Sequence, residues 1–248
     1  MQGAWYTLKR HGTFTKSEQV QFFVTCLFIA LGFFLHWWRT HDISFGLGIL
    51  WFILFFIFAV IFLGIYVWAQ KLKGAQMGYK VSYGYWIPGL LIGFLINVAS
   101  SGLLIVFVPG TVDAMLIDRL KIGKFRGRFN FMHLLVLSVW GLLASFIIVI
   151  ILKPIYFATG GAPGSFMYSL ILMTILIGLY SLIPYPHSIG MNMFRTMRWS
   201  VIWAAAMGVA YALLIVLSNT FSFILAFIIG LVVLIIWHTF IETKKTWA

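Results

Sequence analysis

The sequence predicts an all-α membrane protein that crosses the bilayer several times. Hydrophobic residues make up 62% of its 248 residues and charged residues only 9%, a composition that soluble globular domains do not have. Seven apolar stretches approach the roughly 20 residues that a helix needs to cross a bilayer. They lack the polar–apolar alternation of membrane β-barrel strands. The stretches cover residues 20–38, 45–69, 86–108, 131–152, 165–183, 199–217 and 221–241.

The basic residues indicate how many of these stretches cross. The chain has 17 Lys and Arg against 5 Asp and Glu, and short cytoplasmic loops are enriched in Lys and Arg. If all seven stretches cross, ten basic residues lie on one side and seven on the other. If residues 86–108 enter and leave on one side, 15 lie inside and only Arg39 and Lys153 outside. We therefore predict a cell-membrane protein with six crossings, one re-entrant segment and both termini in the cytoplasm.

The composition of residues 86–108 supports a re-entrant course. Helix-breaking and small polar residues are frequent there, and non-helical backbone at membrane depth is tolerated when it packs on protein or lines a wet cavity. A plain seven-span bundle is the alternative. The residues are Pro88, Gly89, Gly93, Asn97, Ser100, Ser101 and Gly102.

Residues 79–85 have the period of two that is typical of a strand with one apolar face. Tyr79, Val81, Tyr83 and Tyr85 alternate with polar or small residues. A short membrane-surface β-hairpin would follow, and its open edge would offer backbone groups to a partner strand. An aromatic belt at headgroup depth explains the same spacing equally well.

Few side chains offer catalytic or metal-binding chemistry. His36, His41 and Asp42 flank one loop, but a spacing of five does not place the two imidazoles on one helical face, so we expect solvated histidines. The basic run 119–128 is typical of a cytoplasmic anchor for anionic headgroups rather than a nucleic-acid site. We recognise no activated nucleophile, phosphate loop or HExxH motif. We therefore predict no nucleic-acid partner.

One motif points to a family. Residues 181–190, Ser-Leu-Ile-Pro-Tyr-Pro-His-Ser-Ile-Gly, resemble the N-L-L-P-x-P-P-L-D-G sequence of the site-2 protease family of intramembrane zinc metalloproteases. Residues 61–74 resemble the family's HExGHxxxA helix, with Gly64 and Ala69 in place and a basic exit that ends at a glycine. Residues 109–112, Pro-Gly-Thr-Val, are similar to a Pro-Gly-Ala-Val element of an archaeal branch. Together the matches cover residues 45–197, about 60% of the chain.

The resemblance implies that the catalytic groups of the family are absent here. Zn²⁺ requires nitrogen, sulfur or oxygen ligands, whereas most of the corresponding positions are apolar. The resemblance therefore implies a catalytically inactive homologue without a metal or other cofactor. The histidine–glutamate–histidine positions fall on Ile61, Phe62 and Ile65, or on Phe62, Leu63 and Tyr66; the aspartate falls on Ile189 and the asparagine on Ser181.

The expected function is partner binding in the membrane. A pseudoprotease of this kind would bind a transmembrane helix or another membrane protein as a regulator, chaperone or complex subunit. The alternative is a transporter or lipid-handling protein whose re-entrant segment lines a pathway. We expect the partner-binding residues to be Tyr79, Val81, Tyr83, Tyr85, Pro184 and Pro186.

The chain is expected to form a single integral membrane domain, residues 1–248. An N-terminal helix and loop occupy residues 20–44, the site-2-protease-like core 45–197, and a helical hairpin 198–248. Small residues at Ala204, Gly208 and Ala212 share one helix face, which makes an oligomer possible.

Overall fold

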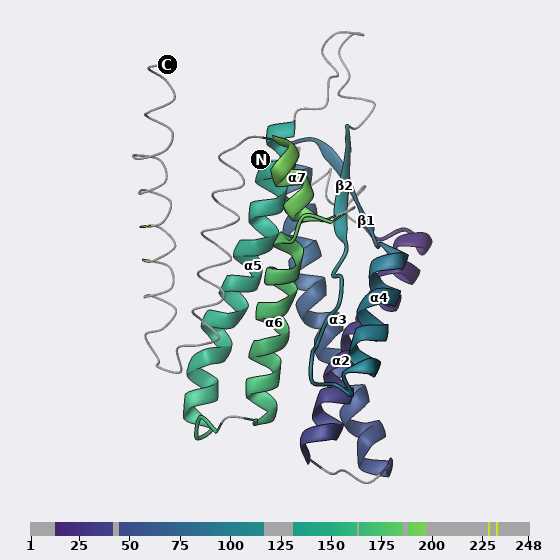
Figure 1. Ribbon diagram of the computed structural model, residues 1–248. Helices are drawn as coiled ribbons and strands as arrows, with labels where there is room; N and C mark the ends of the chain where they lie inside the picture. The colour runs from purple at the N-terminus through teal and green to yellow at the C-terminus, as the bar shows by residue number, and fades with distance from the viewer. Residues whose placement is uncertain are drawn as a thin grey trace, which may run out of the picture.

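The computed structural model describes residues 13–41, 45–116, 131–162, 164–185 and 188–196, together with the single positions 228 and 232. The predicted stretches 199–217 and 221–241, and the small residues of the first, lie outside the described residues. The helices and strands are α2 (Lys16–His41), α3 (Phe45–Gln76), β1 (Tyr79–Gly84), α4 (Ile87–Ala99), β2 (Thr111–Leu116), α5 (Phe131–Ala158), α6 (Phe166–Leu182) and α7 (Ile189–Thr196) (Figure 1).

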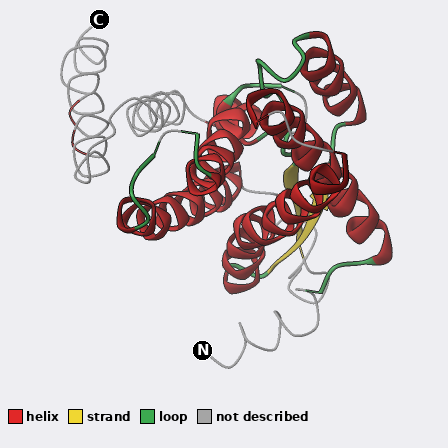
Figure 2. Ribbon diagram, turned by 90° about the horizontal axis from the view of Figure 1, so that it is seen from below, coloured by secondary structure: helices red, strands yellow, loops and turns green. Residues whose placement is uncertain are grey.

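The helices form a bundle with a small sheet at one end. Helix α2 packs on α3, α3 on α5 and α5 on α6, while α4 lies against α2 (Figure 2). Within the described part of the chain, α2, α3 and α5 are long and apolar enough to cross a membrane. Outward residues of α3 such as Ile53, Ile57 and Ile61 are apolar and exposed, as a lipid-facing surface requires. The predicted helical membrane fold is confirmed at this level.

Two helices extend beyond the predicted stretches. Helix α3 continues past Ala69 to Gln76, so Gly74 lies inside the helix and does not end it. The reason for a glycine there is close contact, because a Cβ atom on Gly74 would overlap the Val81 side chain of β1. Helix α5 continues through Pro154 to Ala158. Lys153 is therefore a buried helical residue, and its predicted position in a loop is wrong.

The segment after β1 leaves the sheet and returns to it. Helix α4 is followed by a turn and an extended stretch that leads into β2. The strands pair antiparallel, with Gly84 opposite Thr111 and Tyr79 opposite Leu116, so the chain leaves and returns at the same end of the bundle. The predicted local β-hairpin is wrong, because the partner of β1 lies beyond α4 in the sequence. Period-two alternation indicates a strand but not its partner.

Side chains form hydrogen bonds with backbone groups of the extended stretch that leads into β2. Asn97 Oδ1 accepts a hydrogen bond from the Val106 backbone nitrogen at 2.6 Å, and its Nδ2 donates to the Val106 carbonyl at 2.9 Å. The Tyr180 hydroxyl donates to the Ile105 carbonyl at 2.6 Å. Gly102 turns the chain with φ +76°, where a Cβ atom would lie 2.6 Å from the Leu35 carbonyl group. Asn97 and Tyr180 thus hold the extended backbone inside the bundle, as buried polar groups require.

Candidate functional site

Strand β1 presents two different faces. Tyr79, Val81 and Tyr83 are only 2–3% exposed and lie in the core, whereas Lys80 is exposed and Ser82 half-buried. The alternation confirms the predicted strand. Tyr85 follows the strand and is half-buried. A partner approaching the outer face would therefore contact Lys80 and Ser82, while three of the predicted contact residues support the strand from within.

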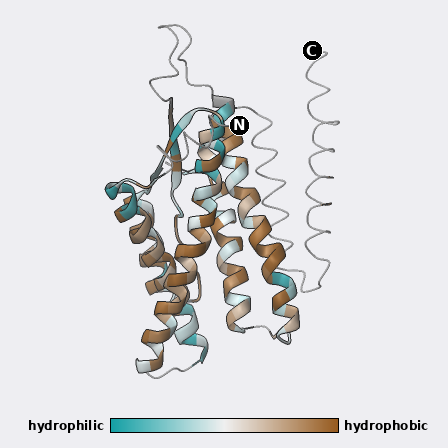
Figure 3. Cartoon of the chain, turned by 180° about the vertical axis from the view of Figure 1, so that it is seen from behind, coloured by the Kyte–Doolittle hydropathy of each residue, from teal (hydrophilic) through white to brown (hydrophobic). Residues whose placement is uncertain are grey.

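A groove runs between the outer face of the sheet and the start of α2. Its volume is about 410 Å³, and it is lined by Ser17 and Gln21 of α2 and by Lys80, Ser82 and Asp113 of the sheet. Asp113 lies opposite Ser82 in the strand register. Figure 3 shows that the sheet end of the molecule is hydrophilic, whereas the middle of the bundle is hydrophobic. Tyr83, Tyr85 and Met115 add apolar surface, so the groove is a recess of mixed polar and apolar lining at the end of an apolar bundle.

Tyr83 fixes the floor of the groove. Its hydroxyl donates to the Pro109 carbonyl at 2.5 Å and also lies 3.1 Å from Thr25 Oγ1 of α2. Gly110 has φ +73°, and a Cβ atom there would lie 2.6 Å from the same hydroxyl. Burial raises the pKa of Tyr83 above its ordinary value, so the side chain stays a neutral hydrogen-bonding group. These contacts give the Pro109–Gly110 sequence a structural role.

A buried ion pair lies next to the groove. Lys71 Nζ of α3 is 2.8 Å from Glu18 Oε2 of α2, and it lies 4.0 Å from the ring centroid of Phe14. Glu18 also accepts from the Thr15 backbone nitrogen, while Thr15 Oγ1 accepts from the Glu18 nitrogen, each at 3.3 Å. This reciprocal pair is a capping box. The pairing of Glu18 with Lys71 was not predicted, although the Thr-x-x-Glu sequence before an apolar run marks a helix start.

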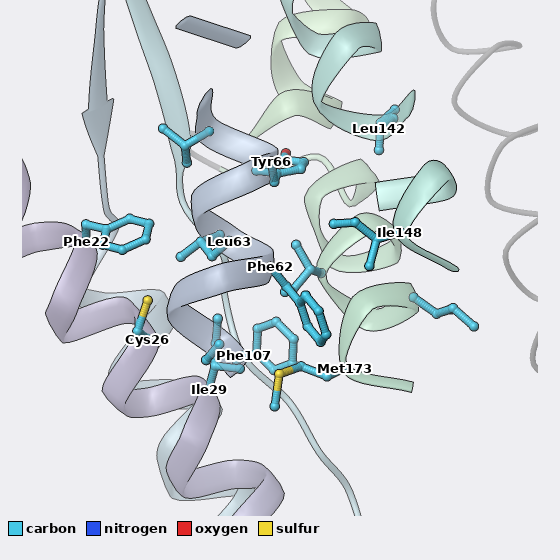
Figure 4. Close-up of a cluster of buried hydrophobic side chains, with 14 of the residues drawn as sticks. Phe22, Cys26, Ile29, Phe62, Leu63, Tyr66, Phe107, Leu142, Ile148 and Met173 are labelled. Carbon is cyan, nitrogen blue, oxygen red and sulfur yellow. The ribbon is translucent and has the colours of Figure 1, made fainter. Parts of the chain in front are cut away.

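The residues of this chain that align with the family's catalytic motif do not all face the same way. Ile61 and Ile65 are 43% and 41% exposed and point away from the core. Phe62, Leu63 and Tyr66 are buried, and Figure 4 shows them among core side chains of the bundle. All three positions of the second register are therefore buried, but Gly64 and Ala69 match the motif only in the first register, in which two of the three positions face outward.

The other motif positions also lie in the interior of the bundle. The Tyr66 hydroxyl faces Ser181 of α6, the position that corresponds to the family's asparagine. Ile189, at the position of the aspartate, is fully buried in the same hydrophobic core as Phe62 and Tyr66. These positions therefore share one interior, which is filled mainly by apolar side chains.

A glycine accounts for the turn after α6. Helix α6 ends at Leu182 before Pro184, and α7 begins at Ile189. A Cβ atom on Gly190 would overlap the Leu182 carbonyl oxygen, so a glycine is required where α7 packs on the end of α6. Pro184 is exposed, whereas Pro186 and His187 lie outside the described residues.

Several side-chain polar atoms of the described residues are buried without a well-formed hydrogen bond. Within the described ranges, Tyr66 Oη, both amide atoms of Gln70 and Tyr185 Oη are buried without a hydrogen bond. Tyr185 stacks on Trp86 with ring centroids 5.7 Å apart, and burial raises its pKa above the ordinary value. These buried polar atoms were not predicted from the sequence.

The histidines in the described ranges have structural contacts. His36 Nδ1 lies 2.9 Å from the Gly102 carbonyl oxygen, and the His41 ring stacks on Trp37 at 3.9 Å. His133 Nδ1 lies 2.6 Å from the Tyr79 hydroxyl. Asp42 lies outside these ranges. In the described part of the chain, no group of three or more His, Cys, Asp or Glu residues could hold a metal ion.

Comparisons with known proteins give no relative. No protein-family model, curated protein or solved structure matches the chain. The resemblance to site-2 proteases therefore depends on the sequence motifs alone.

Proposed function

We propose that this protein is a non-catalytic membrane protein of site-2-protease type that binds a transmembrane helix or another membrane protein. It would act as a regulator, chaperone or complex subunit. The observation that carries the proposal is the groove of about 410 Å³ along the outer face of β1. A strand that is held from within by Tyr83 and open on its other face is a suitable surface for an extended partner segment.

The groove has the chemistry of a surface at the membrane boundary. Its lining combines the cation Lys80 with the anion Asp113 and with hydroxyl and amide groups of Ser17, Ser82 and Gln21. A partner residue leaving the bilayer could therefore pair with either charge. The sheet also has only two strands within the described ranges, and outer strand edges offer backbone donors and acceptors.

The non-catalytic part of the proposal follows from residue chemistry. The family's histidines and glutamate fall on Ile61, Phe62 and Ile65 in one register and on Phe62, Leu63 and Tyr66 in the other, with Ile189 at the aspartate. Phenylalanine, leucine and isoleucine cannot ligate zinc or activate water. The family relationship in this proposal depends on the sequence motifs alone. Six crossings, with the sheet end in the cytoplasm, belong to the same proposal.

The transporter alternative has less support. Asn97 uses both ends of its amide to bind the Val106 backbone. Ser100 Oγ donates to the Asn97 carbonyl and accepts from the Leu104 nitrogen, both at 3.2 Å. These groups hold the segment together, so little of their hydrogen-bonding capacity remains for a transported ligand.

Blocking the groove tests the proposal. A tagged Ser82→Trp variant places an indole in the groove, and we expect it to lose the membrane partner that copurifies with the native protein in mild detergent. Ile57→Trp, at an exposed apolar position of α3, is the matched control and should retain the partner. Equal recovery of the same partner with both variants would refute binding at the groove.

A further inference from the structure

The outer face of the sheet carries a cation and an anion that form no ion pair within the described part of the chain. In the strand register, Lys80 lies opposite Met115 and Ser82 lies opposite Asp113. Residues that face each other in an antiparallel pair point to the same side of the sheet, and all four of these line the groove. Lys80 and Asp113 are therefore diagonal neighbours, which places them roughly 7–8 Å apart. Both charges are left for groups from outside the chain.

The two charges lie at different heights relative to the apolar bundle. Strand β1 ends at Gly84 and leads into α4 (Figure 1), whose exposed side chains such as Ile87 and Leu91 are apolar. Asp113 lies beside Gly84. Lys80 lies toward the other end of β1, where the molecule is hydrophilic (Figure 3). Asp113 is therefore the charge nearer the membrane, and Lys80 is the charge farther from it.

The space beside Asp113 is open to a side chain of a partner. Gly84 lines the groove without a side chain, and a Cβ atom added to it would meet no atom closer than Asp113 Oδ2 at 3.6 Å. The groove also contains the carboxylate of Glu18, but Lys71 already compensates that charge. A cationic side chain that enters the groove over Gly84 therefore finds its partner in Asp113.

The order of the charges fits a chain that leaves the membrane. Cytoplasmic segments next to transmembrane helices are enriched in Lys and Arg, so a partner leaving the bilayer beside the sheet presents a basic residue first. Two residues of an extended chain span about 7 Å, which matches the separation of Asp113 and Lys80.

We propose that the groove binds an extended, membrane-adjacent segment of a transmembrane partner by its charge order. The segment carries a basic residue at the membrane boundary, which pairs with Asp113. It carries an acidic residue two positions farther from the membrane, which pairs with Lys80. This charge order rests on the proposed binding of a membrane partner at the groove.

Two model transmembrane peptides test the charge order. Each has about 20 apolar residues, followed in one by Lys-Ser-Glu and in the other by Glu-Ser-Lys. Energy transfer between a dye on the peptide and a dye on a tag of the full chain measures binding in phosphatidylcholine vesicles. The native chain should bind the Lys-Ser-Glu peptide several-fold more tightly, because the reversed order places like charges side by side. Equal affinities of the native chain for the two peptides would overturn the proposal.

A charge-swapped chain provides the matched comparison. Lys80→Glu combined with Asp113→Lys should prefer the Glu-Ser-Lys peptide. Both residues are exposed, so the double variant should fold, and circular dichroism melting checks this. An unchanged preference for Lys-Ser-Glu in a folded double variant would overturn the proposal.

Ser82→Trp separates failure of the charge order from failure of the proposed function. This variant fills the groove and should bind neither peptide. If the native chain binds both peptides equally and Ser82→Trp binds neither, the groove receives a transmembrane segment but the charge order is wrong. If the native chain and Ser82→Trp bind the peptides alike, the peptides bind elsewhere, and the charge order is overturned. Copurification of the natural partner still tests the proposed function in that case.

Discussion

Lys71 and Glu18 form a buried ion pair, 53 residues apart in the sequence, that ties the end of α3 to the first turn of α2. The pair holds α2, which borders the groove, against α3. A buried charge is costly unless a partner compensates it. The pair therefore constrains how α2 and α3 meet beside β1.

Removing one member of the pair should destabilise the protein strongly. Lys71→Met leaves the Glu18 carboxylate buried and uncompensated, at a cost of about 3–5 kcal/mol. Glu18→Leu combined with Lys71→Met should recover much of this loss. Cys26 is buried and is the single cysteine of the chain, so its reaction with a thiol-reactive dye on heating reports unfolding. Lys73→Met, which removes a contact with the Trp140 ring, should cost at most about 1 kcal/mol; equal effects at both lysines would contradict the account.

Substitutions at Gly74 and Val81, which are in contact, should compensate one another in stability. Gly74→Ala drives a methyl group into the Val81 side chain, and overpacking of this kind costs about 1–3 kcal/mol. Val81→Ala in the same chain should relieve part of the loss. Gly46→Ala is the control, since a Cβ atom there meets nothing within 4 Å. The thiol assay compares the three variants, and a harmless Gly74→Ala would show that α3 and β1 are further apart than described.

Asn97→Leu should loosen the returning stretch before β2. The substitution leaves the Val106 nitrogen and carbonyl without their partners, and each buried unsatisfied group costs about 1–3 kcal/mol. Limited proteolysis between residues 100 and 110 should become faster, and the unfolding midpoint should fall. Leu95→Met, at an exposed position of the same helix, should change neither. Unchanged proteolysis of the Asn97 variant would indicate that the stretch is held by other contacts.

Stability should fall in alkaline solution partly through Tyr185. Burial raises its pKa above the ordinary value of 10.0, so above about pH 10 the unfolded chain loses this proton while the folded chain keeps it. The contribution is fully present below that pH and is lost as the pH rises. Tyr185→Phe should therefore reduce the alkaline loss, as measured by circular dichroism melting between about pH 8 and 11. An identical pH profile for the variant would show that Tyr185 ionises freely in the folded state.

The sequence predicted the helices and the strand better than their contacts. Length and hydropathy identify α2, α3 and α5 because a bilayer-crossing helix must be long and apolar. The alternation of Tyr79, Val81 and Tyr83 identifies β1 because one face is buried. The pairing with β2 could not be derived, since it spans the whole of α4.

Less of the candidate site than of the fold could be predicted from the sequence. The sequence does not reveal that Glu18 compensates the charge of Lys71 inside the bundle. The register of the HExxH-like motif remained open because apolar residues fill both sets of positions. In the structure, Ile61 and Ile65 of the first register are exposed, whereas Phe62, Leu63 and Tyr66 of the second are buried.

Photocrosslinking from Ser82 in native membranes tests the central claim most directly. A photoreactive residue at Ser82 should form one dominant adduct with a single membrane protein, which mass spectrometry maps to a transmembrane or membrane-adjacent segment. The same residue at Ile57 should react mainly with lipid. If Ser82 and Ile57 give the same lipid adducts and no protein adduct, the groove does not bind a membrane-protein partner.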